Sequence, residues 1–437
     1  LELVARRGEF QFYWERPDQE IAFSAGEQEA EIRASGSGRF RVLAVKVADL
    51  ERHTTKCSLV RHSLSGPHLV GGFSFFDTIE DENWNVFGSA SLTLPGWVLI
   101  RDGKMGLLSL TIRSMPGDGK RSIRDKLGSK LARFEELFQF DDTLDTGRAP
   151  LPDGNRTYLD RLDAADDTWI KTVDKAKKLI GAKTLEKIVL AREVRCKIDS
   201  GFSETHILNT LRNQYPTCYN FLIRKEGGRA FLGCSPERLV SFHNTYLLTE
   251  SLAGSTPRGT TATEDLYLEK RLLSSEKNRR EHHYVMKAIE NRLRPFTRRL
   301  ERADIPGIKK LKNVQHLFTP VTAWLNEEVD RFSVLEQLHP TPAVGGFPRD
   351  KAIRHIRELE PFDRGWYAGP VGWLNMNGGG EFAVAIRSGL VEDGDARLFA
   401  GCGIVEDSDP LIEWEETKLK LMPMLSAFRH DGFRQPE

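Results

Sequence analysis

Strand patterns and helix patterns follow one another in this chain without a regular strand–helix–strand repeat. Residues 1 to about 150 show mostly short alternating strand patterns. These patterns lie at Phe10 to Trp14, Phe40 to Val45, Ser91 to Leu99 and Leu107 to Ile112. A doubly wound parallel sheet needs strands and helices in strict alternation. The observed order instead predicts an α+β fold in which antiparallel sheets and helices form separate layers.

The second half of the chain mixes longer helices with strands. We expect a helix over 160–180, a strand from Lys187 to Val194 and a strand meander between Tyr219 and Thr249. Thr261 and Glu264 have the spacing of a capping box and predict the start of one long helix that reaches Leu293.

Residues 140–156 are rich in Asp, Gly and Pro, as a linker or a long surface loop would be. We therefore divide the chain into a mainly β segment, 1–160, and a second region, 161–430, that carries most of the candidate functional residues. We expect the first segment to be integrated into the fold, so that both regions form one structural domain.

Charge and cysteine content exclude several classes of protein. Lys and Arg together number 63, as do Asp and Glu, so no net charge attracts the chain to nucleic acid or to an anionic membrane. The five cysteines are odd in number and form no CxxC or Cys/His cluster, which argues against a zinc site or a disulfide framework. No apolar run approaches the roughly 18 residues of a membrane helix. We expect a cytoplasmic protein.

A glycine-rich strand exit followed by a helix stands near the C-terminus. Gly401-Cys402-Gly403 precedes Asp409-Pro410, a typical N-cap and first helical position. In the helix, Glu413, Glu416 and Lys420 fall at i, i+3 and i+7 and share one face. The pattern is consistent with a divalent-cation and anion site. The alternative is a surface ion pair between Glu416 and Lys420, worth roughly 0.2–0.5 kcal/mol.

Seven segments of the chain carry motifs that have to be considered together. They are Glu186–Arg192, Gly233–Leu239, Leu252–Gly259, Lys277–His282, His339–Gly346, Phe362–Trp373 and the C-terminal motif. In their order along the chain, these segments resemble motifs of the chorismate-utilising enzymes, and among these enzymes they are most similar to the isochorismate synthases. The resemblance covers about residues 160 to 425. It implies two large stacked antiparallel β-sheets flanked by helices, in α/β/β/α layers.

The resemblance also implies a Mg²⁺-dependent isomerisation of chorismate to isochorismate, in which water adds at ring carbon C2 while the C4 hydroxyl leaves. Such a reaction needs a base, an acid and a cation. Lys187 matches the general base of the family and Glu237 the general acid. From the residues alone, Lys187 better suits a strand end whose amine reaches solvent, and Glu237 would also suit an ion pair with a surface cation.

The metal ligands are assigned by the same resemblance. Glu281 and Glu416 match the magnesium ligands, and Glu413 lies on the face of Glu416 as a water-bridged partner. Mg²⁺ takes one or two carboxylates and keeps several waters, which suits this small set better than zinc or calcium would.

Further positions match the residues that bind the dicarboxylate substrate. Arg387 and Tyr367 match one carboxylate site, and Lys420 lies near the metal-bound end. The remaining matches are the backbone N–H groups of Gly401 and Gly403, the turn residues Gly254 and Ser255, and His316 as a residue that orients the ring. Tyr367 and His316 would also fit ordinary core packing.

Two alanines separate this chain from related branches. Ala253 stands where aminodeoxychorismate synthases carry a nucleophilic lysine, so covalent chemistry at C2 is not expected. Ala343 stands where salicylate and anthranilate synthases typically have a threonine, so we expect the reaction to stop at isochorismate, without pyruvate elimination and without an amidotransferase subunit. The alternatives are a salicylate synthase, an ammonia-using anthranilate-type subunit and a non-catalytic chorismate-binding homologue. Menaquinone, siderophore and salicylate biosynthesis all remain open as the pathway served.

Overall fold

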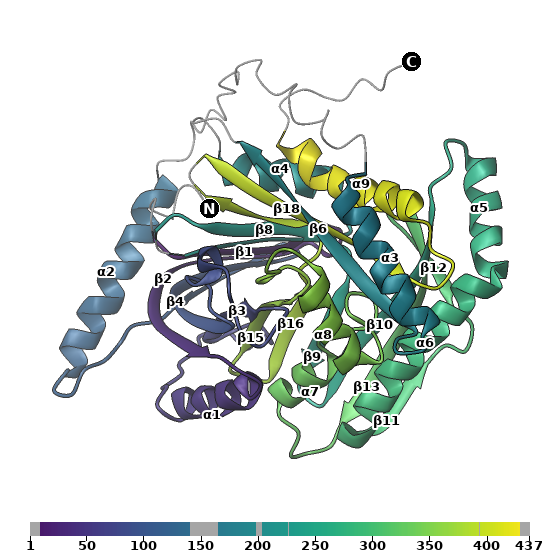
Figure 1. Cartoon of the computed structure of the whole chain (residues 1–437). Coiled ribbons are helices and arrows are strands. Elements are labelled where there is room, and N and C mark those ends of the chain that lie inside the picture. The colour runs from purple at the N-terminus through teal and green to yellow at the C-terminus, as the bar shows by residue number, and fades with distance from the viewer. Residues whose placement is uncertain (1–8, 140–164, 198–202, 226, 393, 429–437) are drawn as a thin grey trace.

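The computed structural model describes residues 9–139, 165–197, 203–225, 227–392 and 394–428 (Figure 1). The helices in these ranges are α1 (Arg39–Arg52), α2 (Lys120–Gln139), α3 (Asp167–Gly181), α4 (Glu204–Gln214), α5 (Ala262–Ser274), α6 (Glu276–Leu293), α7 (Arg331–Leu338), α8 (Arg349–Leu359) and α9 (Pro410–Ala427). None of these helices combines the length and the apolar character needed to cross a membrane. The expected domain boundary near residue 160 and the segment 140–156 lie outside the described residues.

Strands make up the centre of the molecule. They are β1 (Gln11–Arg16), β2 (Ile21–Ala34), β3 (His68–Phe73), β4 (Ala90–Asp102), β5 (Met105–Leu110), β6 (Lys187–Lys197), β7 (Tyr219–Arg224), β8 (Ala230–Ser235), β9 (Arg238–His243), β10 (Tyr246–Pro257), β11 (Thr297–Arg302), β12 (Gly307–Lys310), β13 (Val314–Leu325), β14 (Gly346–Phe347), β15 (Pro370–Asn375), β16 (Gly379–Val384), β17 (Ser388–Glu392) and β18 (Asp395–Ile404).

The strands form two antiparallel arms that meet at the long strands β2 and β4. The first arm runs from β2 through β1, β7, β8, β17, β18 and β6 to β14. The second runs from β4 through β3, β15, β16, β9, β10 and β13 to β11 and β12. The pairing of β2 with β4 shifts register between Gln28 and Ala30, a bulge that bends the strands between the two arms. The α+β prediction is confirmed, and the two sheets are joined into one hydrogen-bonded network.

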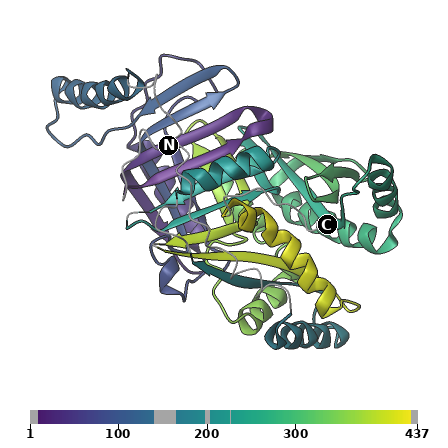
Figure 2. The same cartoon turned by 90° about the horizontal axis from the view of Figure 1, so that it is seen from above.

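A large apolar core lies between the two arms. The rings of Phe23 in β2 and Trp373 in β15 lie 4.6 Å apart, centroid to centroid. The Tyr219 hydroxyl of β7 donates a hydrogen bond of 2.7 Å to Glu381 Oε1 of β16, from one arm to the other. Outside the core, α3, α4 and α9 pack on the first arm, and α5, α6 and α7 on the second. Figure 2 shows α9 lying across the strands, while α2 extends away from the sheets.

One segment that the sequence predicted as a strand is a helix. Phe40 to Val45 lies in α1, where Phe40, Leu43 and Val47 are all buried. Their spacing of three and four residues places them on one helix face. Five of the six residues in 40–45 are apolar, so this short window has no clear period and also fits a strand.

The predicted helix from Thr261 to Leu293 is two helices, α5 and α6. Thr261 caps α5 as expected, since its side chain accepts a hydrogen bond from the Glu264 amide at 3.2 Å. Ser275 ends α5 in an extended conformation, and its hydroxyl accepts from the Asn278 amide at 3.3 Å, which starts α6. A second cap within the apolar pattern therefore breaks the helix.

A buried ion pair links α8 to the first arm. Arg364 and Glu360 have side chains that are each 1% exposed, and their closest approach is 2.5 Å. Arg364 also donates to the carbonyls of Val189 in β6, at 2.8 Å, and of Val344, at 2.9 Å. Glu360 accepts from the Ala191 amide at 2.7 Å. The pair thus fixes β6 against the turn that precedes β14.

We expect Arg364→Met to lower the free energy of unfolding by about 3–5 kcal/mol, because it leaves Glu360 buried without a cation. Denaturant titration measures this loss. Arg357→Met is the matched control, since Arg357 pairs with Glu80 at the surface, with side chains 36% and 69% exposed, and should change stability by less than about 1 kcal/mol. Equal losses in the two variants would contradict the role given to the buried pair.

Candidate active site

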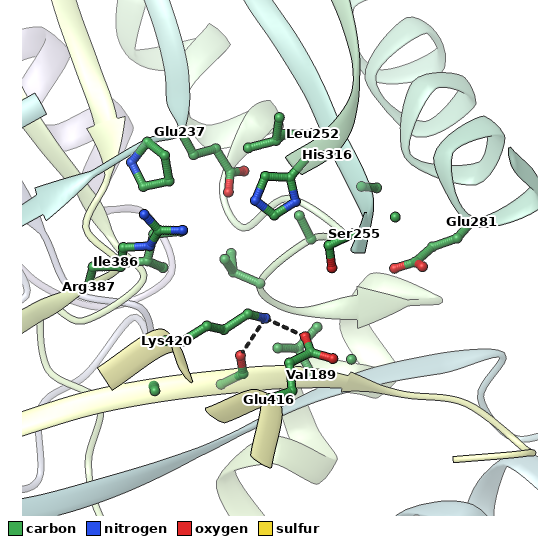
Figure 3. Close-up of a pocket in the computed structure, with 18 of the residues that line it drawn as sticks. Val189, Glu237, Leu252, Ser255, Glu281, His316, Ile386, Arg387, Glu416 and Lys420 are labelled. Carbon is green, nitrogen blue, oxygen red and sulfur yellow. Dashed lines mark hydrogen bonds and ion pairs between the residues drawn. The ribbon is translucent and has the colours of Figure 1, made fainter. Parts of the chain in front are cut away.

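One cavity gathers side chains from both arms and from helices α6 and α9 (Figure 3). The residues singled out from the sequence that line it are Lys187, Glu237, Ala253, Gly254, Ser255, Glu281, His316, Ala343, Tyr367, Arg387, Gly401, Gly403, Glu416 and Lys420. They come from segments more than 200 positions apart in the chain. The structure therefore brings every candidate site residue to one place except Glu413.

Lys187 lies at the first position of β6, with its amine in the cavity. Its Nζ forms an ion pair with Glu281 Oε1 of α6. The charge of Lys187 lowers the pKa of Glu281, so that this carboxyl is ionised. Gly403 of the neighbouring strand β18 leaves room for the lysine, since a Cβ at that position would lie 2.7 Å from Lys187 Cε.

Glu237 lies in the two-residue connection between β8 and β9 and is 5% exposed. Burial, and secondarily the nearby charge of Glu250, raise its pKa to about 7. The Thr341 hydroxyl lies 3.4 Å from Glu237 Oε1 and donates a long hydrogen bond to it. The carboxyl group is thus largely protonated below neutral pH and about half protonated near pH 7, so it can serve as a general acid.

Helix α9 begins as the sequence predicted. The Asp409 side chain accepts hydrogen bonds from the amides of Leu411, at 2.8 Å, and Ile412, at 3.2 Å. One helix face then carries Glu416 and Lys420, which pair at 2.7 Å, and Lys420 Nζ also donates to the Gly401 carbonyl at 3.0 Å. Burial opposes the charge of Lys420, but the pairing with Glu416 outweighs it and raises the pKa of Lys420.

Glu413 lies on α9 but not in the cavity wall. Its carboxyl group is hydrogen-bonded to the side chains of Ser408 and Cys402. Burial is the main reason that the pKa of Glu413 is raised, with a further contribution from Glu416. Glu413 therefore shares a helix face with Glu416 but is held by Ser408 of the turn before α9 and Cys402 of β18, and its role as a water-bridged metal partner stays a prediction.

The carboxylates of Glu281 and Glu416 fit a hard divalent cation. They enter the cavity from two helices, α6 and α9, and both point into its interior (Figure 3). Within the described ranges, no group of three or more His, Cys, Asp and Glu side chains gathers closely enough to enclose an ion. A cation held here would therefore take part of its coordination from water and a ligand, which suits Mg²⁺ better than zinc or calcium.

Local backbone geometry orients two of the cavity side chains. The pairing of β10 with β13 shifts register between Ala253 and Ser255, and Gly254 in this bulge has φ +77°. A bulge turns the following side chain relative to a regular strand, which brings Ser255 to the cavity. Arg387, between β16 and β17, adopts φ +51°, a left-handed conformation that is uncommon for non-glycine residues.

His316 and Tyr367 have environments that favour their neutral forms. Burial, and then the cations Arg387, Lys420 and Lys309, hold the pKa of His316 well below its ordinary value. Burial raises the pKa of Tyr367, whose ring stacks on Phe399 with centroids 5.2 Å apart. Both side chains line the cavity and can therefore act as polar but uncharged contacts.

Sequence reasoning missed the apolar part of the cavity wall. It is formed by Val189, Leu252, Val344, Ile386 and Phe399. Each lies within a few residues of a predicted site residue, so proximity in sequence was the available signal. The cavity therefore joins apolar surface to an acid, two paired lysines and an arginine, which suits a small anionic ring.

Comparison with known proteins agrees with this arrangement. A family model described as "Chorismate binding enzyme" matches residues 1–429. Isochorismate synthase MenF of Bacillus subtilis is 37% identical over 423 residues, which cover 95% of this chain and 87% of that protein. The salicylate biosynthesis isochorismate synthase of Pseudomonas aeruginosa is 37% identical over 421 residues, covering 96% and 85%. The solved structure of MenF, the menaquinone-specific isochorismate synthase from Escherichia coli, has a TM-score of 0.78 and 27% identity, and covers 98% of this chain and 90% of its own.

Proposed function

The chain belongs to the chorismate-binding enzyme family, and we propose from that premise that it converts chorismate to isochorismate. The observation that carries the proposal is that Lys187 and Glu237 line the same cavity, together with Glu281 and Glu416. A basic amine, a protonated carboxyl and two carboxylates are the groups that the reaction requires.

In the proposed reaction, water forms a bond to C2 of the ring, the ring double bonds shift, and the bond from C4 to its hydroxyl breaks. Lys187, in its neutral amine form, takes the proton that the attacking water loses. Glu237 gives a proton to the departing hydroxyl, which leaves as water. The substrate gains and loses one hydroxyl, so the net change is an isomerisation, and a proton must return from Lys187 to Glu237 before the next turnover.

Glu281 and Glu416 are the residues that would hold Mg²⁺, and the charge of the ion would bind a substrate carboxylate. The same charge would weaken the ion pair between Glu281 and the Lys187 ammonium. Arg387 presents a planar guanidinium to the cavity and suits a second carboxylate. Tyr367 and neutral His316 orient the ring. The N–H groups of Gly401 and Gly403 remain proposed contacts.

The small side chains of Ala253 and Ala343 determine which product the proposed reaction gives. Both line the cavity, and neither offers a nucleophile or a hydroxyl group. With no lysine at position 253, the group that attacks C2 is water. With no threonine at position 343, the enolpyruvyl group stays on the ring, so the product is isochorismate rather than salicylate or anthranilate.

We further propose a cytoplasmic enzyme that works without an amidotransferase subunit. Free, buried Cys196, Cys218, Cys234 and Cys402 suit a reducing compartment. The N-terminal strands β1 and β3 pair with β7 and β15 of the later region. These pairings support the proposal that the two regions form one structural domain.

An assay of chorismate with Mg²⁺, with and without ammonium and with products separated by chromatography, tests the function. We expect isochorismate alone.

We also expect removal of divalent cations by EDTA to lower the rate at least 100-fold, since a metal supplies several kcal/mol of charge stabilisation. Addition of Mg²⁺ should restore the rate. Glu416→Gln should weaken binding of Mn²⁺, measured by electron paramagnetic resonance. In the chromatographic assay, salicylate with pyruvate would support a salicylate synthase, and anthranilate would support an anthranilate-type subunit. No turnover would support a non-catalytic homologue that binds chorismate.

A further inference from the structure

A largely buried ion pair binds the peptide groups on either side of Glu237. Glu250 in β10 and Lys309 in β12 approach to 2.7 Å, with side chains 5% and 18% exposed, and neither forms part of the cavity wall. We infer that this pair is a positioning element for Glu237, which fixes the chain on both sides of the acid and acts on its carboxyl group through charge. The inference rests on the proposed function, because it takes Glu237 as the proton donor.

The pair holds the residue before Glu237 and the residue after it. Lys309 Nζ donates to the Pro236 carbonyl at 2.8 Å, and the Arg238 amide donates to Glu250 Oε1 at 3.1 Å. The same Oε1 atom accepts from Lys309. One carboxylate and one ammonium therefore join the two flanking peptides through a single hydrogen-bonded unit.

The peptide groups of Glu237 itself are also bound. Its amide donates to Ser235 Oγ at 3.2 Å, and its carbonyl accepts from the Val384 amide of β16 at 3.1 Å. With the Glu250–Lys309 pair, these bonds fix a connection of only two residues at four points. The direction of the Glu237 side chain is thus set by β10, β12 and β16 together, and a shift of the pair would move the acid.

The charges of Glu250 and Lys309 act on the carboxyl group of Glu237 from outside the cavity wall. Glu250 is the nearby anion that favours the protonated carboxyl, while Lys309 of β12 and Lys420 of α9 favour ionisation. His316 of β13 and Arg387 of the β16–β17 connection also face the cavity around Glu237 (Figure 3), and His316 is uncharged. If Glu250 lost its charge, the effect of Lys309 and Lys420 on Glu237 would be less opposed, so the proton of Glu237 would leave at a lower pH.

The test is the pH dependence of kcat. Activity requires a protonated Glu237 and therefore falls at high pH. We expect Glu250→Gln to move this fall by about one pH unit toward lower pH, the size expected for a unit charge roughly 10 Å away at an effective dielectric constant of about 20. The double variant Glu250→Gln/Lys309→Met removes both charges and should return the fall to within a few tenths of a pH unit of the unmodified enzyme.

Glu269→Gln is the matched control. Glu269 pairs with Lys310 at 2.7 Å, and Lys310 follows Lys309 on β12, so its side chain points to the opposite face of the strand. This control should leave the pH dependence unchanged. An unshifted pH dependence in Glu250→Gln, or an equal shift in Glu269→Gln, would overturn the inference.

Glu250→Asp covers the case in which Glu250→Gln does not fold. Aspartate keeps the charge but is shorter, so it cannot reach both Lys309 and the Arg238 amide unchanged. We expect kcat to fall at least 10-fold, with an unchanged KM and an unchanged pH dependence; an unaltered kcat would contradict the positioning role. Failure of the proposed function looks different, because the unmodified enzyme would then not convert chorismate at all.

Discussion

Lys187→Ala should lower kcat by a factor of about 10²–10⁴, the contribution typical of a positioned general base, and leave the fold intact. Lys187 lies at the start of β6, and its amine contacts Glu281 within the cavity, where a water molecule bound beside the substrate would need to lose its proton. Alanine removes the amine without disturbing the pairing of β6 with β14 and β18, which uses backbone atoms. Steady-state kinetics with chorismate and circular dichroism measure the two effects.

Lys277→Ala is the matched control for this substitution. Lys277 lies one helical turn before Glu281 on α6 and pairs with Asp407 at the surface, at 3.3 Å. It places a positive charge near Glu281 without lining the cavity. We expect kcat to change less than about threefold in this variant, the scale of a screened surface charge. If both alanine variants lost activity equally, Lys187 would act through the charge of Glu281 rather than as the base.

Glu237→Gln should also lower kcat by a factor of about 10²–10⁴, because glutamine has the shape of the acid but cannot give a proton to the departing hydroxyl. Substrate binding should change little, since the amide fills the same volume. The variant should therefore show a low kcat with a nearly unchanged KM. A substrate analogue with a better leaving group at C4 should recover part of the lost rate, because it needs less proton transfer.

The same substitution should stabilise the fold at high pH. Folding raises the pKa of Glu237 from 4.5 to about 7, so between these values the folded state binds a proton that the unfolded chain has released. Stability therefore falls as the pH rises through this range, by up to about 3 kcal/mol. Glutamine does not titrate, so the stability of Glu237→Gln relative to the unmodified protein should increase by up to that amount between pH 4 and pH 8.

Denaturant titrations at the two pH values test this effect. Glu392→Gln serves as the control, because Glu392 pairs with Arg229 at the surface, at 2.6 Å, with its side chain 41% exposed. Its relative stability should change by less than about 1 kcal/mol over the same pH range. An inactive Glu237→Gln protein with no gain in stability at pH 8 would show that Glu237 is not held as a buried acid.

Features set by neighbouring residues could be predicted from the sequence. The start of α9 at Asp409 and Pro410, and the cap of α5 at Thr261, depend on side chains within three residues of the backbone groups they bind. Short apolar patterns were less reliable. The window 40–45 fitted a strand, and only the burial of Leu43 and Val47 against the core shows the helical period. The break at Ser275 was missed because the apolar residues continue on both sides of it.

Features set by contacts over long distances in the chain could not be derived from local patterns. The motif resemblance named the residues of the cavity, but it did not reveal that Lys187 pairs with Glu281, 94 positions away. It did not reveal that Glu413, although close enough to feel the charge of Glu416, is hydrogen-bonded to Ser408 and Cys402 outside the cavity wall; its role as a water-bridged metal partner stays a prediction. It also assigned Gly403 to the substrate, while the geometry adds a steric reason for a glycine beside Lys187.

Strand β6 finds both of its partners late in the polypeptide. It pairs with β14 at residues 346–347 and with β18 at residues 395–404. During translation, the apolar run from Ile188 to Ala191 therefore leaves the ribosome long before either partner has been synthesised. Unpaired apolar strands of this kind promote aggregation. We expect production of this protein in cells to depend on chaperones, and fragments that end before residue 395 to be insoluble.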